Sequence, residues 1–306
     1  MRFLIYQESR QGPRKSNQDR IAYSYSRDSL VMVVCDGMGG HLHGEIAAHI
    51  AVQFLIEAFQ KQARPLLEDP HRFLIDGITN AHLAIISYAE NKHLLETPRT
   101  TCVACVIQEG IAYWAHVGDS RLYLIRDGRV EAVTKDHSRV QQLIDMGRVR
   151  EEAAGNHPDR NKVFNCLGQI NLPRIDISRR TPLRTNDTLL LCSDGLWGPI
   201  SNRTIVEAVL RQDILRAMPE VFNAAETRAG AEGDNLSAIA MTWLEENQAG
   251  DAEDDPDTVS TKTMQLGDVS TQTAGFGSRA NRDYLSDEEI ERAIEEIRGA
   301  IKKAAT

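Results

Sequence analysis

Apolar and polar residues along the first part of the chain predict three short β-strands, at 3–7, 20–26 and 30–36. In the third, residues 31–35 are apolar without interruption, as in a strand that is buried on both faces. In two longer segments that follow, apolar residues recur every three or four positions and share one helical face. The first face consists of Ala47, Ile50, Ala51, Phe54, Leu55, Ala58 and Phe59, and the second of Leu74, Ile78, Ala81, Ile85 and Tyr88. Two successive helices argue against a doubly wound parallel sheet.

After Pro98 the pattern changes to runs of β-branched and aromatic residues that are joined by very short links. We predict four strands here, at 99–109, 110–119, 120–127 and 128–134, and we expect them to form a meander.

The rest of the pattern predicts further helices and strands around one irregular surface segment. The expected helices are 137–146, 201–212 and 213–229, the expected strands are 173–183, 186–194 and 235–245, and the irregular segment is 147–168. Many antiparallel strands with helices in pairs predict an α+β fold. The expected architecture is a four-layer sandwich of two packed antiparallel β-sheets flanked by pairs of α-helices.

Composition divides the 306 residues into three parts. Residues 1–246 hold all of these elements and are predicted to form one domain. Residues 247–283 are acidic and rich in Ser and Thr, which predicts a disordered linker. Residues 284–303 predict an amphipathic helix, with Ser286 and Glu289 as a capping box and isoleucines every three or four positions. Because the apolar stripe of this helix is narrow, the helix needs a partner surface to be stable. The alternative interpretation of residues 284–303 is a loosely helical tail without function.

Charge, cysteine usage and hydropathy exclude several classes of protein. The net charge is −9, much of it in the tail, so nucleic acid is not an expected partner. The five cysteines are an odd number, which argues against a disulfide framework. Cys102 and Cys105 form a CxxC, but residues three apart on a strand point to opposite faces and do not share a metal. Because no segment has the pattern of a signal peptide or a membrane span, we expect a cytoplasmic protein.

Four apolar runs end or begin at an aspartate beside glycine or serine. Asp36, Asp119 and Asp194 each follow such a run, and Asp234 precedes the last one. A turn-forming aspartate would explain any one of them. The pair at 127–128, Asp-Gly, is an internal control, because it lies between two short strands as a hairpin turn does. Four recurrences are hard to explain as independent turns, so we interpret these acids as one site.

The chemistry of this predicted site is that of oxygen ligands. Carboxylates without paired His or Cys suit Mg²⁺ or Mn²⁺ rather than Zn²⁺. Several converging acids repel one another unless cations neutralise them, which favours two or more ions. Two ions about 4 Å apart activate water and stabilise phosphoryl transfer. A phosphate also needs a cationic side chain, for which Arg14 is the best candidate, although a solvated loop cation is the simpler interpretation of this residue.

Seven stretches of sequence carry a resemblance to a known family. They are RKSNQDR, CDGMGGHLHGEIA, AHVGDSRLYLIRDG, KDHS with LIDMG, HPDRN with CLGQ, LCSDGLW and GDNLSAI. In order and spacing they resemble the motifs of type 2C metal-dependent serine/threonine protein phosphatases, in particular the bacterial branch, over roughly residues 5–245. The resemblance implies that residues 1–246 are a metal-dependent phosphatase catalytic domain. It implies hydrolysis of phosphoserine and phosphothreonine in proteins, with a cytosolic serine/threonine kinase as the opposing enzyme.

The resemblance also implies a cofactor, Mn²⁺ or Mg²⁺, with two central ions and a third, weaker one. The implied ligands are Asp36, the carbonyl of Gly37, Asp119, Asp194 and Asp234, while Arg14 binds the substrate phosphate and Asp19 orders waters beside the ions. Of these, Asp36 bridges the central ions, and Asp119 joins Asp194 at the third. Residues 149–165, which we call the flap, would lie beside the site and influence substrate choice.

Two positions depart from the family pattern. Met38 stands where some relatives have a histidine proposed as general acid, so a metal-bound water or His41 must take that part if it is used. Gln18 stands where many relatives have glutamate, which lowers the negative charge of the site by one. Neither change removes a ligand, so we expect activity. His116 and His137, which lie in matching motifs, are interpreted as structural hydrogen-bonding residues.

Two alternatives keep the fold and change the function. One is a catalytically silent phosphoprotein-binding module, which would have lost metal ligands, whereas all four carboxylates are present. The other is a phosphatase of small phosphomonoesters, which the sequence does not separate from a protein phosphatase. For the tail, we expect phosphorylation of the linker and docking of the 284–303 helix on the catalytic domain or on a partner.

Overall fold

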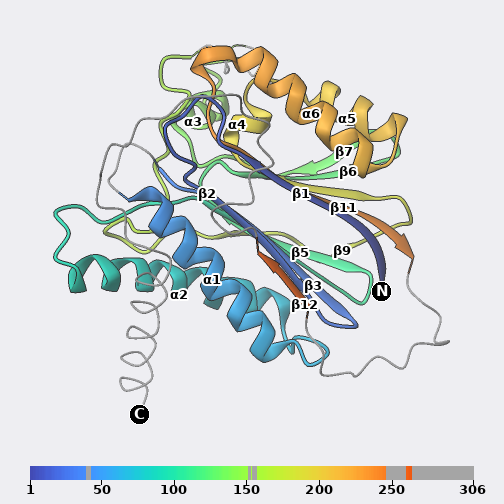
Figure 1. Ribbon diagram of the computed structural model, residues 1–306, viewed down its shortest axis with the longest axis horizontal. Coiled ribbons are helices and arrows are strands. Elements are labelled where there is room, and N and C mark those ends of the chain that lie inside the picture. The colour runs from blue at the N-terminus through green and yellow to red at the C-terminus, as the bar shows by residue number, and fades with distance from the viewer. Residues whose placement is uncertain (39–42, 151–152, 154–156, 246–259, 264–306) are drawn as a thin grey trace, which may run out of the picture.

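Two antiparallel sheets pack face to face, with helices on both outer faces (Figure 1). The computed structural model describes all residues except 39–42, 151–152, 154–156, 246–259 and 264–306. Sheet A consists, in spatial order, of β1 (Arg2–Arg10), β11 (Leu236–Glu245), β10 (Thr188–Cys192), β6 (Arg121–Arg126) and β7 (Arg129–Val133). Sheet B consists of β12 (Ser260–Thr263), β2 (Asp19–Tyr25), β3 (Ser29–Asp36), β4 (Cys102–Gln108), β5 (Ile111–Val117) and β8 (Asp176–Ile177), and β9 (Thr181–Pro182) also pairs with β5.

The helices form the two outer layers of the sandwich. Sheet B is covered by α1 (Gly44–Gln62) and α2 (Pro70–Asn91), in the lower part of Figure 1. Sheet A is covered by the short α4 (Asp194–Trp197), α5 (Asn202–Arg211) and α6 (Ile214–Ala229), in the upper part. Outside these layers, α3 (Arg139–Asp145) precedes the flap, and a 3₁₀ turn (Gly230–Glu232) follows α6. The predicted four-layer α+β sandwich is confirmed.

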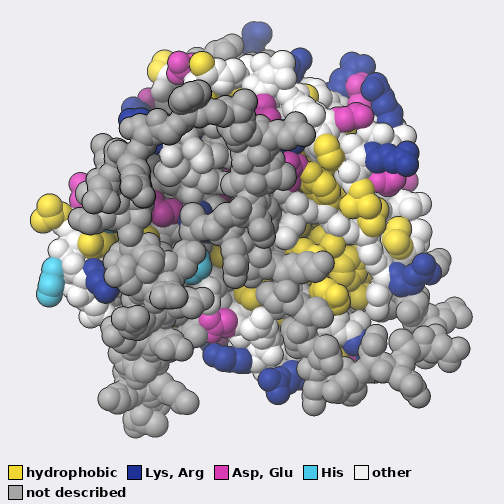
Figure 2. Space-filling model, in the orientation of Figure 1, with side chains coloured by type: hydrophobic (Ala, Val, Ile, Leu, Met, Phe, Trp, Pro, Cys, Tyr) yellow, Lys and Arg dark blue, Asp and Glu magenta, His cyan; other side chains and the backbone are white. Residues whose placement is uncertain are grey.

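Alternating side chains of the strands divide the core into layers. On β3, Val31 and Val33 face α1 and α2, while Met32 and Val34 face sheet A. Residues of β4 alternate in the same way, so Cys102 and Cys105 lie in different layers, as the strand interpretation of their CxxC required. Hydrophobic side chains gather on the visible face over the strands, between the two helical layers (Figure 2).

The predicted meander at 99–134 is wrong in one respect. The strands form two separate hairpins, β4–β5 in sheet B and β6–β7 in sheet A, so the chain crosses between sheets after β5. The crossing occurs at Gly118, whose φ of 103° favours glycine and whose added Cβ would lie 2.6 Å from the side chain of Thr101. Short links cannot distinguish a hairpin from a crossing, and the difference matters because Asp119 lies at this crossing.

Other elements bear on the sequence predictions. Asp127 and Gly128 form the turn of the β6–β7 hairpin with φ values of 50° and 70°, so their interpretation as a structural turn is confirmed.

Within the predicted linker, residues 260–263 form β12 and pair with β2, which differs from the expected disorder at these four positions. The rest of the linker and the 284–303 helix lie outside the described residues, and the domain boundaries stay predictions. Among the described helices, none is long and apolar enough to cross a membrane.

Candidate active site

The strand ends predicted to form one site meet at one end of the sandwich. Asp36 ends β3, Asp119 lies between β5 and β6, Asp194 follows β10, and Asp234 precedes β11. The charge of Asp36 interacts with those of the other three and of Asp19, which is its direct partner in the β2–β3 register. Both sheets therefore contribute acids to the same cluster, although the acids are far apart in the sequence.

The backbone holds these acids rigidly. The N–H of Asp36 donates to Thr101 Oγ1 at 3.0 Å, and its carbonyl accepts from Thr101 N–H at 2.9 Å. The carbonyl of Asp119 accepts from Trp197 Nε1 at 3.0 Å. The indole of Trp197 lies under the guanidinium of Arg121, 3.4 Å from the ring centroid. The backbones of Asp36 and Asp119 are thus held by contacts that do not use their carboxyl oxygens.

Burial and mutual repulsion, in that order, determine the electrostatics of the cluster. Burial, followed by the neighbouring carboxylates, raises the pKa of Asp36 well above its usual range. For the same two reasons the pKa of Asp194 is raised to about 7. Burial, followed by Asp194, also raises the pKa of Asp119. Burial raises the pKa of Asp19 to about 6, although a hydrogen bond from Ser193 Oγ at 2.8 Å opposes the increase. Two buried acids, Asp19 and Asp119, and three half-buried ones are therefore gathered without enough positive charge.

This arrangement fits hard divalent cations. The cluster offers oxygen donors only, and cations would remove the repulsion that raises the pKa values. One oxygen of Asp19, Oδ1, is buried and has no hydrogen-bond partner, as expected for a carboxylate beside a site for ions and their waters. Asp19, Asp36, Asp119, Asp194 and Asp234 are thus brought together as the sequence predicted, and which of them are ligands remains a prediction.

Position 37 has no room for a side chain, so only glycine fits there. An added Cβ there would lie 2.4 Å from the carbonyl oxygen of Gly44 and 2.7 Å from that of Gln18. The N–H of Gly37 donates to the same Gln18 oxygen at 3.2 Å, and its backbone also bridges to Thr100. A side chain would push the strand end away from the start of α1, so this position holds the backbone close to the acids.

Arg14 reaches the rim of the cluster. Its Nη2 donates to Asp234 Oδ2 at 2.7 Å and its Nε to the carbonyl of Gly233 at 3.2 Å, while about half of the side chain stays exposed, 52%. Arg14 is therefore a half-exposed loop cation with fixed partners, and its phosphate-binding role stays a prediction. Because the guanidinium is at once anchored and accessible, it lies where an anion entering the site would meet it.

Sequence reasoning missed the residues that support the cluster. Asn235 is the clearest case, since its Nδ2 donates to the carbonyls of Gln11 and Ser16, and its Oδ1 accepts from the N–H of Gln18. It thereby ties the loop that carries Arg14 to the start of β11. The motifs GDN and DGLW contain Asn235 and Trp197, so the signal was present, but only the contacts give these residues their roles.

Two predicted features fall partly outside the described structure. His41, the alternative general acid, lies outside the described residues. The backbone N–H of Met38 donates to the carbonyl of Arg99 at 3.0 Å, which is a structural contact. The flap is described at 149–150, 153 and 157–165.

An α+β sandwich of this topology, with a cluster of uncompensated carboxylates at one end, defines the class of protein phosphatase 2C enzymes. The family model described as protein phosphatase 2C matches residues 7–246. The chain therefore belongs to the protein phosphatase 2C family.

Individual relatives agree with this assignment. The chain is 32% identical over 230 residues to the serine/threonine phosphatase stp of Listeria monocytogenes, which covers 74% of this chain and 90% of that protein. The crystal structure of Staphylococcus aureus Stp1 is similar with a TM-score of 0.74 and 28% identity, over 80% of this chain and 96% of that one. The catalytic domain of the serine/threonine phosphatase PstP, in complex with two manganese ions, is similar with a TM-score of 0.66 and 29% identity, over 79% and 99%.

Proposed function

We propose that this protein hydrolyses phosphoserine and phosphothreonine in proteins with a metal-activated water, and that it opposes a cytosolic serine/threonine kinase. The observation that carries the proposal is the cluster of buried and half-buried carboxylates with raised pKa values, with the accessible guanidinium of Arg14 at its rim. Membership of the protein phosphatase 2C family and relatives named serine/threonine phosphatase support the reaction class.

The proposed cofactor is Mn²⁺ or Mg²⁺, because the donors are all oxygen and a relative binds two manganese ions. Asp36, Asp194, Asp234 and the carbonyl of Gly37 would hold two central ions, and Asp119 with Asp194 would hold a third. When bound, the ions supply Lewis-acid activation of water and neutralise charge in the transition state.

The chain's own residues bind and orient the phosphate. Arg14 would hold two phosphate oxygens through its planar guanidinium. The same guanidinium pairs with Asp234 at 2.7 Å. Because about half of the Arg14 side chain is exposed, it would be able to turn from Asp234 toward a phosphate in the site. Asp19 would accept hydrogen bonds from waters through Oδ1, while Ser193 holds its other oxygen, Oδ2.

The general acid is not assigned to a side chain. A thioether has no proton to donate, so Met38 does not serve. We propose that water protonates the leaving alkoxide, with His41 as the alternative.

The proposed partners are phosphorylated proteins, and the proposed location is the cytoplasm. For the tail, we propose that the 284–303 helix docks on the catalytic domain or on a partner. Truncation after Glu246 should then change turnover or partner binding, and identical kinetics together with identical pull-downs would exclude a role in either.

The experiment that tests the function is phosphate release from a phosphothreonine peptide and from a small phosphomonoester of similar leaving-group pKa. Each is measured with EDTA, Mg²⁺ or Mn²⁺. We expect release from the peptide that requires a divalent ion. Release that persists in EDTA would show that the metal assignment is wrong. A kcat/KM for the small ester as high as that for the peptide would favour the phosphomonoesterase, and folded protein without any release would favour the silent binding module.

A further inference from the structure

His137 lies where the flap, the crossing between the sheets and sheet B meet, and its hydrogen bonds to the crossing run in both directions. The backbone N–H of His137 donates to the carbonyl of Gly118 at 2.9 Å, and its ring Nδ1 accepts from the N–H of Gly118 at 3.1 Å. Gly118 is the residue before Asp119. The position of Asp119 is therefore tied to the side chain of His137 through the backbone of one residue, Gly118.

The same ring nitrogen also holds the end of the flap. Asn165 Nδ2 lies 2.7 Å from His137 Nδ1, and the N–H of Phe164 donates to the carbonyl of His137 at 3.0 Å. Asn165 is itself fixed, since its amide exchanges hydrogen bonds with the backbone of Arg174, 2.8 Å and 3.0 Å long. One imidazole nitrogen thus accepts from both the crossing and the flap.

These partners fix the tautomer of His137. A backbone N–H only donates, so Nδ1 must present a lone pair to Gly118. The proton of the neutral ring is then on Nε2, which lies 3.2 Å from Asp176 Oδ2, while the side chain is only 1% exposed. Burial, followed by the neighbouring His116, lowers the pKa of His137, which agrees with a neutral ring.

A metal site is the obvious alternative reading of this region. His116, His137 and Asp176 have ligand atoms that all lie within 4.8 Å of one another, and in the described part of the chain no other such triple of metal-binding residues occurs. His137, however, has no lone pair to spare, because Nδ1 accepts from Gly118 and Nε2 carries the proton. His116 Nε2 lies 2.9 Å from the carbonyl of Lys135, which only accepts. His137 thus has no lone pair for an ion, and His116 is a stacked second ring, 4.7 Å from the first, so we interpret the triple as structural and not as an ion site.

We propose that His137 is a positioning residue that couples the end of the flap to Asp119. The expected kinetic effects rest on the proposed function. The link between the flap and Gly118 through His137 does not depend on that function. A change in the flap, as when a protein substrate contacts it, would reach Asp119 through Asn165, His137 and the backbone of Gly118. The ring would thus connect the segment that meets the substrate with the predicted ligand of the third ion.

Two substitutions test the proposal. His137→Leu removes the acceptor, while His137→Asn places an amide oxygen where Nδ1 was. In the leucine variant we expect kcat to fall about tenfold, with a similar increase in the Mn²⁺ concentration for half-maximal rate, as is typical when a residue behind a metal ligand is lost. The asparagine variant should recover most of both effects, and the KM of a small phosphomonoester should change little in either.

A second readout does not depend on catalysis. Trypsin cleavage at Arg150 and Arg160, which are exposed flap residues, reports whether the flap end is held. We expect faster cleavage in His137→Leu and a wild-type rate in His137→Asn. Arg126→Leu is the matched control, because it breaks a buried contact at the opposite end of sheet A and should destabilise the domain without changing cleavage or Mn²⁺ dependence.

The outcomes separate the two proposals. If His137→Leu retains the wild-type kcat, Mn²⁺ dependence and cleavage rate, the coupling does not exist. If Arg126→Leu reproduces every effect of His137→Leu, the effects come from stability alone and the positioning role is wrong. If the wild type releases no phosphate at all, the proposed function fails, whereas faster cleavage in the leucine variant with recovery in the asparagine variant would still support the link to the flap.

Discussion

Strand β10 has an aspartate near each end, Asp187 buried and Asp194 half-buried, and the two are in opposite electrostatic states. Asp187, directly before the strand, accepts from Arg126 Nε at 2.8 Å, from its Nη2, and from the N–H of Arg184 at 2.7 Å. Asp194, two residues after the strand, faces other carboxylates, and burial together with these neighbours raises its pKa to about 7. The same residue type on the same strand is therefore neutralised at one end and left uncompensated at the other.

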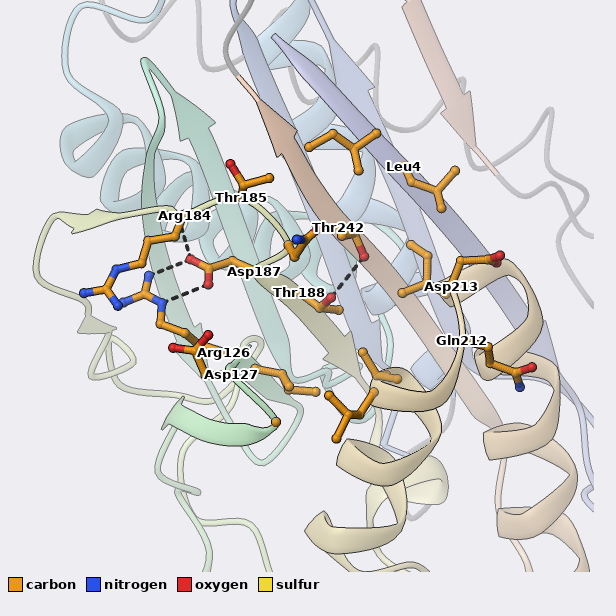
Figure 3. A pocket seen from close by; sticks show the side chains of 17 residues that line it. Leu4, Arg126, Asp127, Arg184, Thr185, Asp187, Thr188, Gln212, Asp213 and Thr242 are labelled. Atoms are coloured by element: carbon orange, nitrogen blue, oxygen red, sulfur yellow. Dashed lines mark hydrogen bonds and ion pairs between the residues drawn. The ribbon is translucent and has the colours of Figure 1, made fainter.

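A cavity of about 460 Å³ lies at the compensated end (Figure 3). Arg126 and Asp187 are joined by hydrogen bonds at its side, and Thr188 and Thr242 bond to each other across the strands at 3.0 Å. The polar side chains that line the cavity thus include pairs that form hydrogen bonds with each other. A hollow alone does not identify the active site of this molecule. The uncompensated charge identifies it, because such charge is stable only if something else binds there.

The largest expected effect is that of Asp194→Asn on activity. Removing one carboxylate ligand should lower kcat/KM about a thousandfold, since the ions supply several kcal/mol of transition-state stabilisation. In EDTA, the same change should leave the melting temperature equal or higher, because it removes repulsion rather than a favourable contact. Phosphate release and thermal melts of the metal-free protein check both parts. A large loss of stability in EDTA would mean that Asp194 has a structural partner.

The opposite result is expected for Arg126→Leu. It leaves Asp187 buried without its counter-charge, which should cost about 3–5 kcal/mol of the free energy of unfolding. The kcat/KM of the folded protein should not change, because this end of β10 takes no part in the reaction. Urea unfolding and phosphate release measure the two quantities. The double variant Arg126→Leu/Asp187→Leu is the control, and it should recover most of the stability because no charge is left unpaired.

The sequence could predict the uncompensated end of β10 better than the compensated one. Asp194 follows an apolar strand beside a glycine, Asp36 and Asp119 share this local pattern, and Asp234 shows its mirror image. The partner of Asp187 is Arg126, 61 positions away in the chain, and no local pattern predicts such a pair. The meander failed for the same reason, since the crossing at Gly118 depends on how two sheets pack. The sequence predicted the residues that form the site from local patterns, but it did not predict contacts between segments that are distant in the chain.

The pH dependence of stability provides the third test. In the metal-free protein, the pKa values of Asp19, about 6, and Asp194, about 7, lie above the ordinary value of 3.8. The folded state therefore binds more protons than the unfolded state between about pH 4 and pH 7, so these groups lower the free energy of unfolding as the pH rises. In EDTA we expect Asp194→Asn to flatten the decrease in melting temperature across this range.

Metal should reverse this dependence. A divalent ion at a hundred times its Kd should add about 2.7 kcal/mol at pH 7, and less at pH 5, where protons compete for the carboxylates. Melting temperatures with Mn²⁺ at both pH values measure this difference. Parallel pH profiles for wild type and Asp194→Asn, with and without Mn²⁺, would show that the carboxylates are not coupled to each other or to an ion.

The smallest expected effect is that of Gln18→Glu, which restores the glutamate of many relatives. Gln18 Nε2 donates to Glu45 Oε2 at 3.0 Å, so the new carboxylate would face an existing one beside the acid cluster. Stability in EDTA should fall by about 1 kcal/mol, while Mn²⁺ affinity rises a few-fold because the site gains one negative charge. The exchanged pair Gln18→Glu/Glu45→Gln keeps the hydrogen bond and the total charge. If Mn²⁺ affinity depends on total charge, this pair should match the wild type, and if it depends on a carboxylate at position 18, the pair should match Gln18→Glu.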